Sequence, residues 1–295
     1  MKKIAQVFSL IFFAFTAIAV AQENQSTKWF RVQSNNGEFS IEVPTKNNYF
    51  YDKDGFSASI DQSDFKLKEM NLLNSYTEKT LLSIETYEAN KDALRTFYKS
   101  HRTGKISDFK LNSSVAKEHI DKQNNFYSKT FYFYSKKYIY IITAASRNGE
   151  TVAMKHFFDS IMFNSDNKTD SAIVPFSSLR LTTIDLKITN ESEAKTGKKV
   201  ETPKDNSLSS LIIISKPPPS FVDSARSRGV QGLIRMNALF SLDGFIPKIE
   251  VTKSLPEGLL RQTVFAALRI KFLPMEKDGN PQSVTKTIEY NFTLY

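Results

Sequence analysis

Residues 215–295 read SKPPPSFVDSARSRGVQGLIRMNALFSLDGFIPKIEVTKSLPEGLLRQTVFAALRIKFLPMEKDGNPQSVTKTIEYNFTLY, and this run determines how the last quarter of the chain folds. Apolar residues at every second position from Ile234 to Leu242 predict a β-strand with one buried face. Asp243-Gly244 predicts a tight hairpin turn, because both turn positions need positive φ. A return strand then buries Ile249 and Val251, and its Pro247 predicts a free edge or a bulge.

The rest of this run predicts two helices and one more strand. A short helix over 221–228 ends at a glycine, and a second helix over about 257–270 has an apolar stripe. Asp278-Gly279 predicts another turn. The last strand alternates cleanly, with Val284, Ile288, Tyr290, Phe292 and Leu294 on one face. The predicted order is ββαβ, with one helix packed on a small antiparallel sheet.

These residues resemble the C-terminal domain of TonB and TonB-family proteins. The resemblance depends on a set of marks in order: Pro218-Pro219 before Phe221, then Ala225, Gly229 and Gly232, the Asp243-Gly244 turn, Phe272 and Pro274, and the turn Asp278, Gly279, Pro281. The chain departs from the family at Phe221-Val222, where Tyr-Pro is usual, and at Ile270, where Trp is frequent.

The resemblance implies a non-enzymatic module that captures a short extended segment of an outer-membrane receptor, or of another envelope protein, by adding it as a strand. A small sheet leaves edges whose N–H and C=O groups can pair with such a segment. We expect the edge at the last strand to bind the partner, flanked by the outward side chains of Thr287, Glu289, Asn291 and Thr293. The alternative is that this edge pairs with a second copy, giving a homodimer.

Residues 1–21 have the pattern of a secretory signal peptide. Two lysines precede an apolar run that ends in Ala19-Val20-Ala21, an A-x-A cleavage site. We therefore expect a periplasmic protein. The alternative is an uncleaved inner-membrane anchor facing the periplasm, which would be the chain's one membrane contact. The chain has no cysteine, so disulfides, thiolate metal sites and a lipoprotein anchor are excluded.

Residues 28–164 predict an α+β domain with an antiparallel sheet and helices. Strands are expected over 39–43, 56–60, 80–87, 126–134 and 137–145, and helices over 90–102 and 150–163. The element order weakly resembles PsbP-like domains. Rings crowd the 126–145 hairpin on both faces, and we expect a helix over one face and wet tyrosine hydroxyls on the other. The alternative is an exposed aromatic surface.

Residues 165–210 predict a linker with one or two short strands near Leu186, followed by a C-terminal domain over 211–295. The predicted fold class is therefore α+β in two parts. A linker this short favours an alternative function, a periplasmic adaptor or scaffold without energy coupling.

The composition gives no support for catalysis or for a cofactor. The three histidines, His101, His119 and His156, have no metal-ligand spacing, and no nucleophile elbow or phosphate-binding loop is present. The net charge is +9, but no long basic run or zinc-finger spacing indicates nucleic-acid binding. We therefore expect no enzyme activity, no metal and no cofactor.

Overall fold

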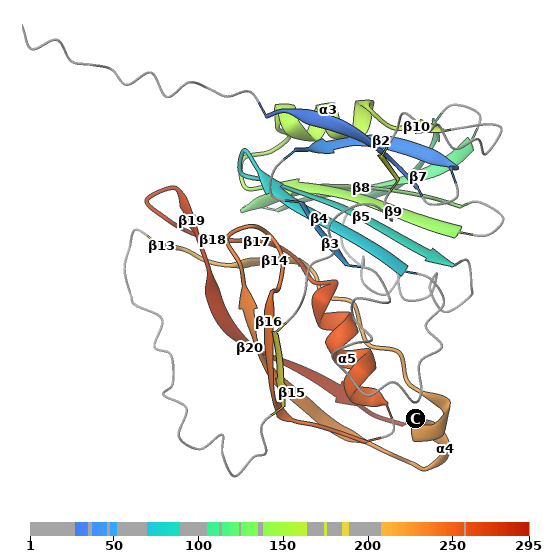
Figure 1. Cartoon of the computed structure of the whole chain (residues 1–295), viewed down its shortest axis with the longest axis vertical. Helices are drawn as coiled ribbons and strands as arrows, with labels where there is room; N and C mark the ends of the chain where they lie inside the picture. Colours follow the sequence, from blue (N-terminus) through green and yellow to red (C-terminus); the bar gives the residue numbers. More distant parts are fainter. Residues whose placement is uncertain are drawn as a thin grey trace, which may run out of the picture.

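The structure is a computed structural model, and it shows two β-rich parts packed together (Figure 1). Within the described residues, none of the helices is both long and apolar enough to cross a membrane. The predicted signal segment, the strand over 56–60, the helix over 90–102 and most of the linker lie outside the described residues. Those are 27–34, 37–45, 48–51, 70–88, 105–111, 114–123, 125–134, 138–163, 174–175, 185–188, 208–256 and 258–294.

The N-terminal part is built on a seven-stranded antiparallel sheet. Its strands run in the order β3-β4-β5-β9-β8-β7-β6. The aromatic hairpin predicted from the sequence forms its centre as β8 and β9. The strands are β3 (Asn48–Tyr51), β4 (Met70–Thr77), β5 (Thr80–Glu88), β6 (Lys105–Leu111), β7 (Ser114–Gln123), β8 (Phe126–Tyr134) and β9 (Tyr138–Ser146).

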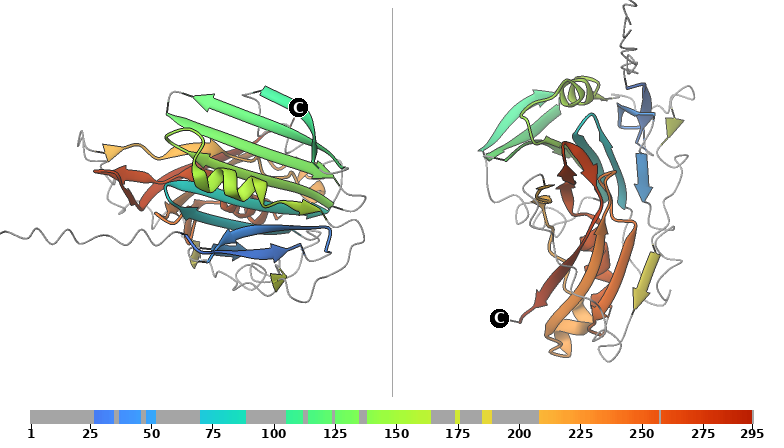
Figure 2. Two further views of the ribbon diagram at one scale, coloured as in Figure 1. Left: turned by 90° about the horizontal axis from the view of Figure 1, so that it is seen from above. Right: turned by 90° about the vertical axis from the view of Figure 1, so that its left-hand side faces the viewer.

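A helix and a small second sheet cover one face of this large sheet. Figure 2 shows helix α3 lying over this face of the sheet. The hydroxyl of Thr151 caps α3 by accepting a hydrogen bond from the backbone N–H of Met154 at 3.1 Å. Phe39 packs edge-on against Tyr140, with ring centroids 4.8 Å apart. The covering elements are α3 (Val152–Asp159), β1 (Trp29–Gln33), β2 (Phe39–Pro44), β10 (Met162–Phe163) and β11 (Val174–Pro175).

The other face of the large sheet is also buried, which corrects the expectation of wet tyrosine hydroxyls. Tyr132 is 0% exposed, and its neighbours on that face, Ile141 and Ala145, are buried as well. The helix expected over 150–163 is shorter, and its first residue, Val152, faces solvent rather than the core. Both faces of the aromatic hairpin therefore contribute to a core.

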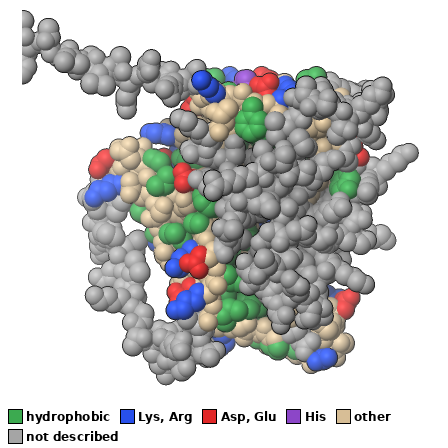
Figure 3. Space-filling view, in the orientation of Figure 1, with side chains coloured by type: hydrophobic (Ala, Val, Ile, Leu, Met, Phe, Trp, Pro, Cys, Tyr) green, Lys and Arg blue, Asp and Glu red, His purple; other side chains and the backbone are tan. Residues whose placement is uncertain are grey.

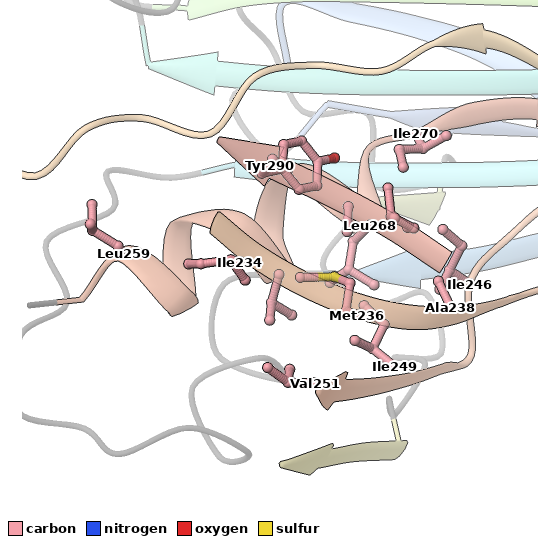
Figure 4. Packing of buried hydrophobic residues seen from close by; sticks show 14 of the residues in the cluster. Ile234, Met236, Ala238, Ile246, Ile249, Val251, Leu259, Leu268, Ile270 and Tyr290 are labelled. Carbon is pink, nitrogen blue, oxygen red and sulfur yellow. The ribbon is translucent and has the colours of Figure 1, made fainter. Parts of the chain in front are cut away.

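The C-terminal part combines a four-stranded sheet, in the order β12-β16-β15-β20, with helix α5. Figure 4 shows side chains from the strands and from α5 meeting in one core, among them Ile234, Met236, Leu268 and Tyr290. This arrangement contains the predicted ββαβ order. The elements are α4 (Asp223–Ser227), β15 (Gly232–Phe240), β16 (Lys248–Lys253), α5 (Leu259–Leu268), β20 (Val284–Phe292) and β12 (Asp185–Ile188).

Three details of the predicted hairpin are wrong. Gly244 has φ +84, but Asp243 is not at positive φ, so these residues are part of a longer loop instead of a two-residue turn. Leu242 lies beyond the strand and is 40% exposed. The edge beside Pro247 is not free, because β12 pairs with β16 in parallel and the N–H of Asp185 donates to the carbonyl of Pro247 at 2.9 Å. The hairpin does have a register irregularity, but it lies between Val251 and Lys253 and not at Pro247.

Short strands complete the C-terminal part. The turn between β18 and β19 has both Asp278 and Gly279 at positive φ (51° and 75°), as a two-residue hairpin requires. Strand β14 pairs with β17, and β13 pairs with β18. The strands are β13 (Leu208–Ser209), β14 (Ile212–Ser215), β17 (Lys271–Leu273), β18 (Met275–Lys277) and β19 (Asn280–Gln282).

The two parts share a buried contact. One apolar cluster contains Leu81 and Phe126 of the large sheet together with Ile212 and Leu273 of the C-terminal part. The Arg147 guanidinium donates hydrogen bonds to the carbonyls of Ser210 (2.7 Å) and Pro274 (2.5 Å). The C-terminal part is therefore docked on the N-terminal sheet.

The loop between β15 and β16 also takes part in this contact. A Cβ atom placed on Gly244 would lie 3.0 Å from the Cβ of Tyr76 and 3.2 Å from Leu81. Glycine at this position therefore meets two requirements, the positive φ and the close approach of the loop to the N-terminal sheet.

Candidate partner-binding edge

Strand β20 carries three of the four side chains predicted to flank a partner. Thr287, Glu289 and Asn291 lie on it, and Thr293 follows its last residue. All four are exposed, whereas the alternating residues Ile288, Tyr290 and Phe292 are buried in the core. The period-two pattern therefore places the predicted residues on the outward face of the sheet.

The same strand lies at the edge of its sheet. It pairs with β15 over nine residues, from Gly232↔Phe292 to Phe240↔Val284. Within the described parts of the chain, no strand pairs with its other side. The opposite edge of the sheet differs, because β12 already covers β16 there. Of the two edges, β20 is the one that offers a long row of backbone groups.

Side-chain contacts indicate which backbone groups of β20 point away from β15. The Thr252 hydroxyl on β16 donates to the carbonyl of Arg235 at 3.3 Å, so the odd-numbered residues of β15 direct their backbone groups toward β16. The even-numbered residues of β15 therefore exchange backbone hydrogen bonds with the even-numbered residues of β20 that lie opposite them. The odd-numbered residues of β20 therefore direct their N–H and C=O groups to the free edge.

A second contact agrees with this assignment. The ammonium group of Lys216 donates to the carbonyl of Glu289 at 2.8 Å, although Lys216 lies outside the β15–β20 ladder. The carbonyl of Glu289 is therefore reachable from the free side. Thr285, Thr287, Glu289 and Asn291 are the residues whose backbone groups form this edge.

The predicted side chains themselves contact their own sheet. Glu289 pairs with Arg235 on β15 at 2.6 Å, and the Thr287 hydroxyl donates to Asn237 at 2.9 Å. Asn291 donates to the Thr293 hydroxyl at 3.4 Å. The first two contacts join β20 to β15, and the third stays within the last segment of the chain. The backbone groups, rather than these side chains, are therefore the features turned toward an incoming strand.

Sequence reasoning missed Lys216, which lies between β14 and the three prolines at 217–219. Its ammonium group is 4.5 Å from the ring centroid of Tyr290, in addition to its bond to Glu289. Partial burial lowers the pKa of Lys216, and the nearby Glu289 carboxylate opposes that effect. No local sequence pattern indicates a contact between residues 73 positions apart.

The described residues give no metal centre. No three His, Asp or Glu side chains among them are grouped closely enough to hold a metal ion. His156 bonds the Glu42 carboxylate at 2.7 Å and lies against the Trp29 ring. His119 is buried in the large sheet, and His101 is outside the described residues.

Taken together, the open edge strand, the ββαβ order and the helix-covered core define a small protein-interaction domain. Residues 217–294 match the family described as the Gram-negative bacterial TonB protein C-terminal domain. This part of the chain is therefore a TonB C-terminal domain. Domains of this family are non-enzymatic protein-interaction modules associated with the cell envelope.

Two solved structures are similar to the chain. A solution NMR structure of the Pseudomonas aeruginosa TonB C-terminal domain has 22% identity, covering 31% of this chain and 90% of that one, with a TM-score of 0.26. A crystal structure of a protein from Bacteroides thetaiotaomicron at 1.50 Å has 11% identity, covering 48% of this chain and 50% of that one, with a TM-score of 0.29. No curated protein matches the chain.

Proposed function

We propose that the protein is a non-enzymatic envelope module whose C-terminal domain captures an extended segment of another protein by strand addition at β20. In TonB-dependent transport across the outer membrane, that protein is an outer-membrane receptor. The observation that supports this proposal is the edge formed by the backbone groups of Thr285, Thr287, Glu289 and Asn291 in a TonB C-terminal domain. A periplasmic location accompanies the proposal, with segment 1–21 as signal or anchor.

Backbone pairing supplies the affinity in this mode of recognition, and pockets for alternate side chains supply the specificity. Four odd-numbered residues from Thr285 to Asn291 direct four N–H and four C=O groups to the edge, and one of these, the Glu289 carbonyl, also accepts a hydrogen bond from Lys216. A segment of about seven residues would satisfy them, because successive strand residues rise about 3.3 Å.

One pair of variants separates backbone capture from side-chain contacts. Asn291→Pro removes an N–H that faces the free edge, and it leaves the even-numbered ladder bonds to β15 intact. Asn291→Ala removes the side chain and keeps the N–H. Full-length protein is incubated with solubilised outer membranes and cross-linked, and the cross-linked peptides are mapped by mass spectrometry.

Strand capture predicts that a receptor segment cross-links near β20 in the wild type and in Asn291→Ala. The cross-link to this segment should be absent in Asn291→Pro. The fold of that variant is checked by its thermal melting temperature. Equal cross-linking by both variants would show that the β20 backbone is not the binding element.

A second candidate function is an envelope adaptor or scaffold that does not couple energy. The observation that favours it is the docking of the C-terminal domain on the N-terminal sheet, where Arg147 and a shared apolar cluster hold the two parts together. A C-terminal domain held in this way is fixed to the folded N-terminal part instead of being carried on a flexible linker. N-terminal sequencing of protein from fractionated cells tests it, because a soluble form that begins at Gln22 has no membrane anchor.

A further inference from the structure

The free edge of β20 is already occupied at one position by a side chain of the same protein. The ammonium group of Lys216 donates to the carbonyl of Glu289 at 2.8 Å and lies 4.5 Å from the Tyr290 ring centroid. Glu289 is in the interior of the edge, between Thr287 and Asn291. Any strand that pairs along this edge must use the same carbonyl.

A partner strand that pairs here therefore competes with the Lys216 ammonium group for the Glu289 carbonyl. Lysine side chains at sheet edges are a recognised protection against unwanted pairing. The bond that has to be broken is a single exposed hydrogen bond, whereas the strand gains a row of ladder bonds. Lys216 therefore protects the edge reversibly. It disfavours binding of a segment that has no group with which the Lys216 amine can form a new hydrogen bond or ion pair.

The displaced amine remains on the core-facing side of the edge. Tyr290 and Lys216 lie on that side, because Tyr290 points into the core. The Glu289 carboxylate projects on the opposite, outward side, where it pairs with Arg235 at 2.6 Å. Once the carbonyl is taken, the exposed amine turns to water unless the bound segment supplies an anionic group on that side.

Building on the strand capture proposed above, we propose that Lys216 selects the partner. The β20 edge accepts an extended segment of an envelope protein that carries a carboxylate on its core-facing side, opposite Tyr290, where the displaced amine binds it. The ring of Tyr290, whose centroid lies 4.5 Å from the amine, excludes water from one side of that ion pair and so strengthens it relative to one in open water. The net charge of +9 assists the approach of an acidic segment.

The probes are two peptides with the same charge. The sequence of β15, GLIRMNALF, already pairs with β20 in antiparallel register, so it is a strand of suitable length and pattern. One peptide carries Ile234→Glu, which in the register of β15 puts the carboxylate opposite Tyr290 on the core-facing side. The other carries Asn237→Glu, which places it opposite Thr287 on the outward side. Each is labelled with fluorescein, and binding to the full-length protein is measured by anisotropy.

We expect the wild-type protein to bind the Ile234→Glu peptide about fivefold more tightly than the Asn237→Glu peptide. Lys216→Met should bind the two peptides equally, and Lys216→Arg should keep the preference. Lys216 is exposed, so the melting temperature of Lys216→Met should be close to that of the wild type.

The outcomes distinguish this proposal from the proposed function. Equal binding of both peptides by the wild type, or a preference that persists in Lys216→Met, overturns the role of Lys216 and leaves strand capture standing. Failure of both proteins to bind either peptide overturns strand capture as well. A wild-type dimer in sedimentation with β20 at its interface would also overturn the proposal, because a second copy would then occupy the edge.

Discussion

The ammonium group of Lys271 on β17 bonds the carboxylate of Glu85 on β5, and both side chains are almost fully buried (3% and 1% exposed). Arg269 makes a second contact to the same carboxylate at 3.4 Å. The lysine and the arginine belong to the TonB C-terminal domain, whereas the glutamate belongs to the N-terminal sheet. The charges are therefore paired only while the two parts of the chain are docked.

Replacement of Lys271 by methionine should destabilise the protein strongly. Lys271→Met leaves the buried Glu85 carboxylate with Arg269 alone, and breaking a buried pair costs about 3 kcal/mol or more. Lys248→Met is the matched control, because Lys248 pairs with Asp185 at 3.1 Å on the surface and such a pair contributes less than about 1 kcal/mol. Urea unfolding monitored by circular dichroism measures both costs. Equal costs would contradict the buried role of Lys271.

Adding Glu85→Gln to Lys271→Met should recover part of the lost stability, because the buried carboxylate that has lost one of its two cationic partners is then removed. The coupling between the two sites is obtained from a double-mutant cycle. Additive effects of the two substitutions would show that the residues do not interact.

Removal of the Tyr290 hydroxyl should stabilise the protein. It is buried and has no hydrogen-bond partner among the residues that the structure describes. Tyr290→Phe should therefore raise the free energy of unfolding by about 1 kcal/mol at pH 7. Tyr140→Phe is the matched control with the opposite sign, because the Tyr140 hydroxyl donates to the Glu38 carboxylate. A loss of stability in Tyr290→Phe would contradict this prediction.

The same substitution should reduce the loss of stability in alkali. Burial raises the pKa of Tyr290 well above its ordinary value of 10, and the Arg269 charge opposes this effect only in part. The unfolded chain therefore loses the Tyr290 proton from about pH 10, before the folded protein does, so stability falls as pH rises above 10. The contribution of Lys271 to the pH dependence has the opposite sign. Burial lowers its pKa, so the folded protein loses this proton before the unfolded chain does, and stability increases as pH rises toward 10.5. Thermal midpoints from pH 8 to 11.5 should fall less in Tyr290→Phe than in wild type.

A buried row of polar side chains crosses the face of the large sheet that is opposite to α3. Its members are in register on five neighbouring strands: Asn74, Ser83, Thr143, Thr130 and His119. The hydroxyls of Thr130 and Thr143 form a hydrogen bond with each other at 3.0 Å. The hydroxyl of Ser83 has no partner within the described part of the chain.

This difference within the row predicts two different responses. Thr143→Val should cost about 1–2 kcal/mol, because it leaves the Thr130 hydroxyl buried without its partner. Ser83→Ala should be neutral or stabilising, since it removes a buried group that makes no hydrogen bond. Denaturant midpoints of the two variants test this, and a large cost for Ser83→Ala would indicate that a water or a ligand satisfies its hydroxyl.

Local patterns in the sequence predicted the C-terminal domain better than the N-terminal one. The alternation around Ile288 and Tyr290 identified β20 and its buried face, because a period of two directly reports a half-buried strand. The Asp278-Gly279 turn was found for the same local reason. The longer loop at Gly244 was not, because its shape depends on contact with Tyr76 in the other part of the chain.

The candidate site was predicted only in part for a related reason. Thr287, Glu289 and Asn291 follow from the strand alternation, so their exposure was predictable. The direction of their backbone groups depends on the pairing with β15, which a single strand's pattern does not contain. The contact of Lys216 with the Glu289 carbonyl likewise depends on the folded arrangement of distant segments.

The turn between β4 and β5 was missed because it lacks the usual turn residues, and this predicts a stabilising substitution. Glu78 and Lys79 both have positive φ (47° and 58°), a conformation that disfavours side chains with a Cβ. Lys79→Gly should raise the free energy of unfolding by about 0.5 kcal/mol, because relief of this strain exceeds the added entropy of the unfolded chain. Gly279→Ala, in the equivalent turn of β18 and β19, should lower it by about 1 kcal/mol. Urea midpoints of the two variants should move in opposite directions, and a decrease for Lys79→Gly would show that the Lys79 side chain contributes more than its backbone costs.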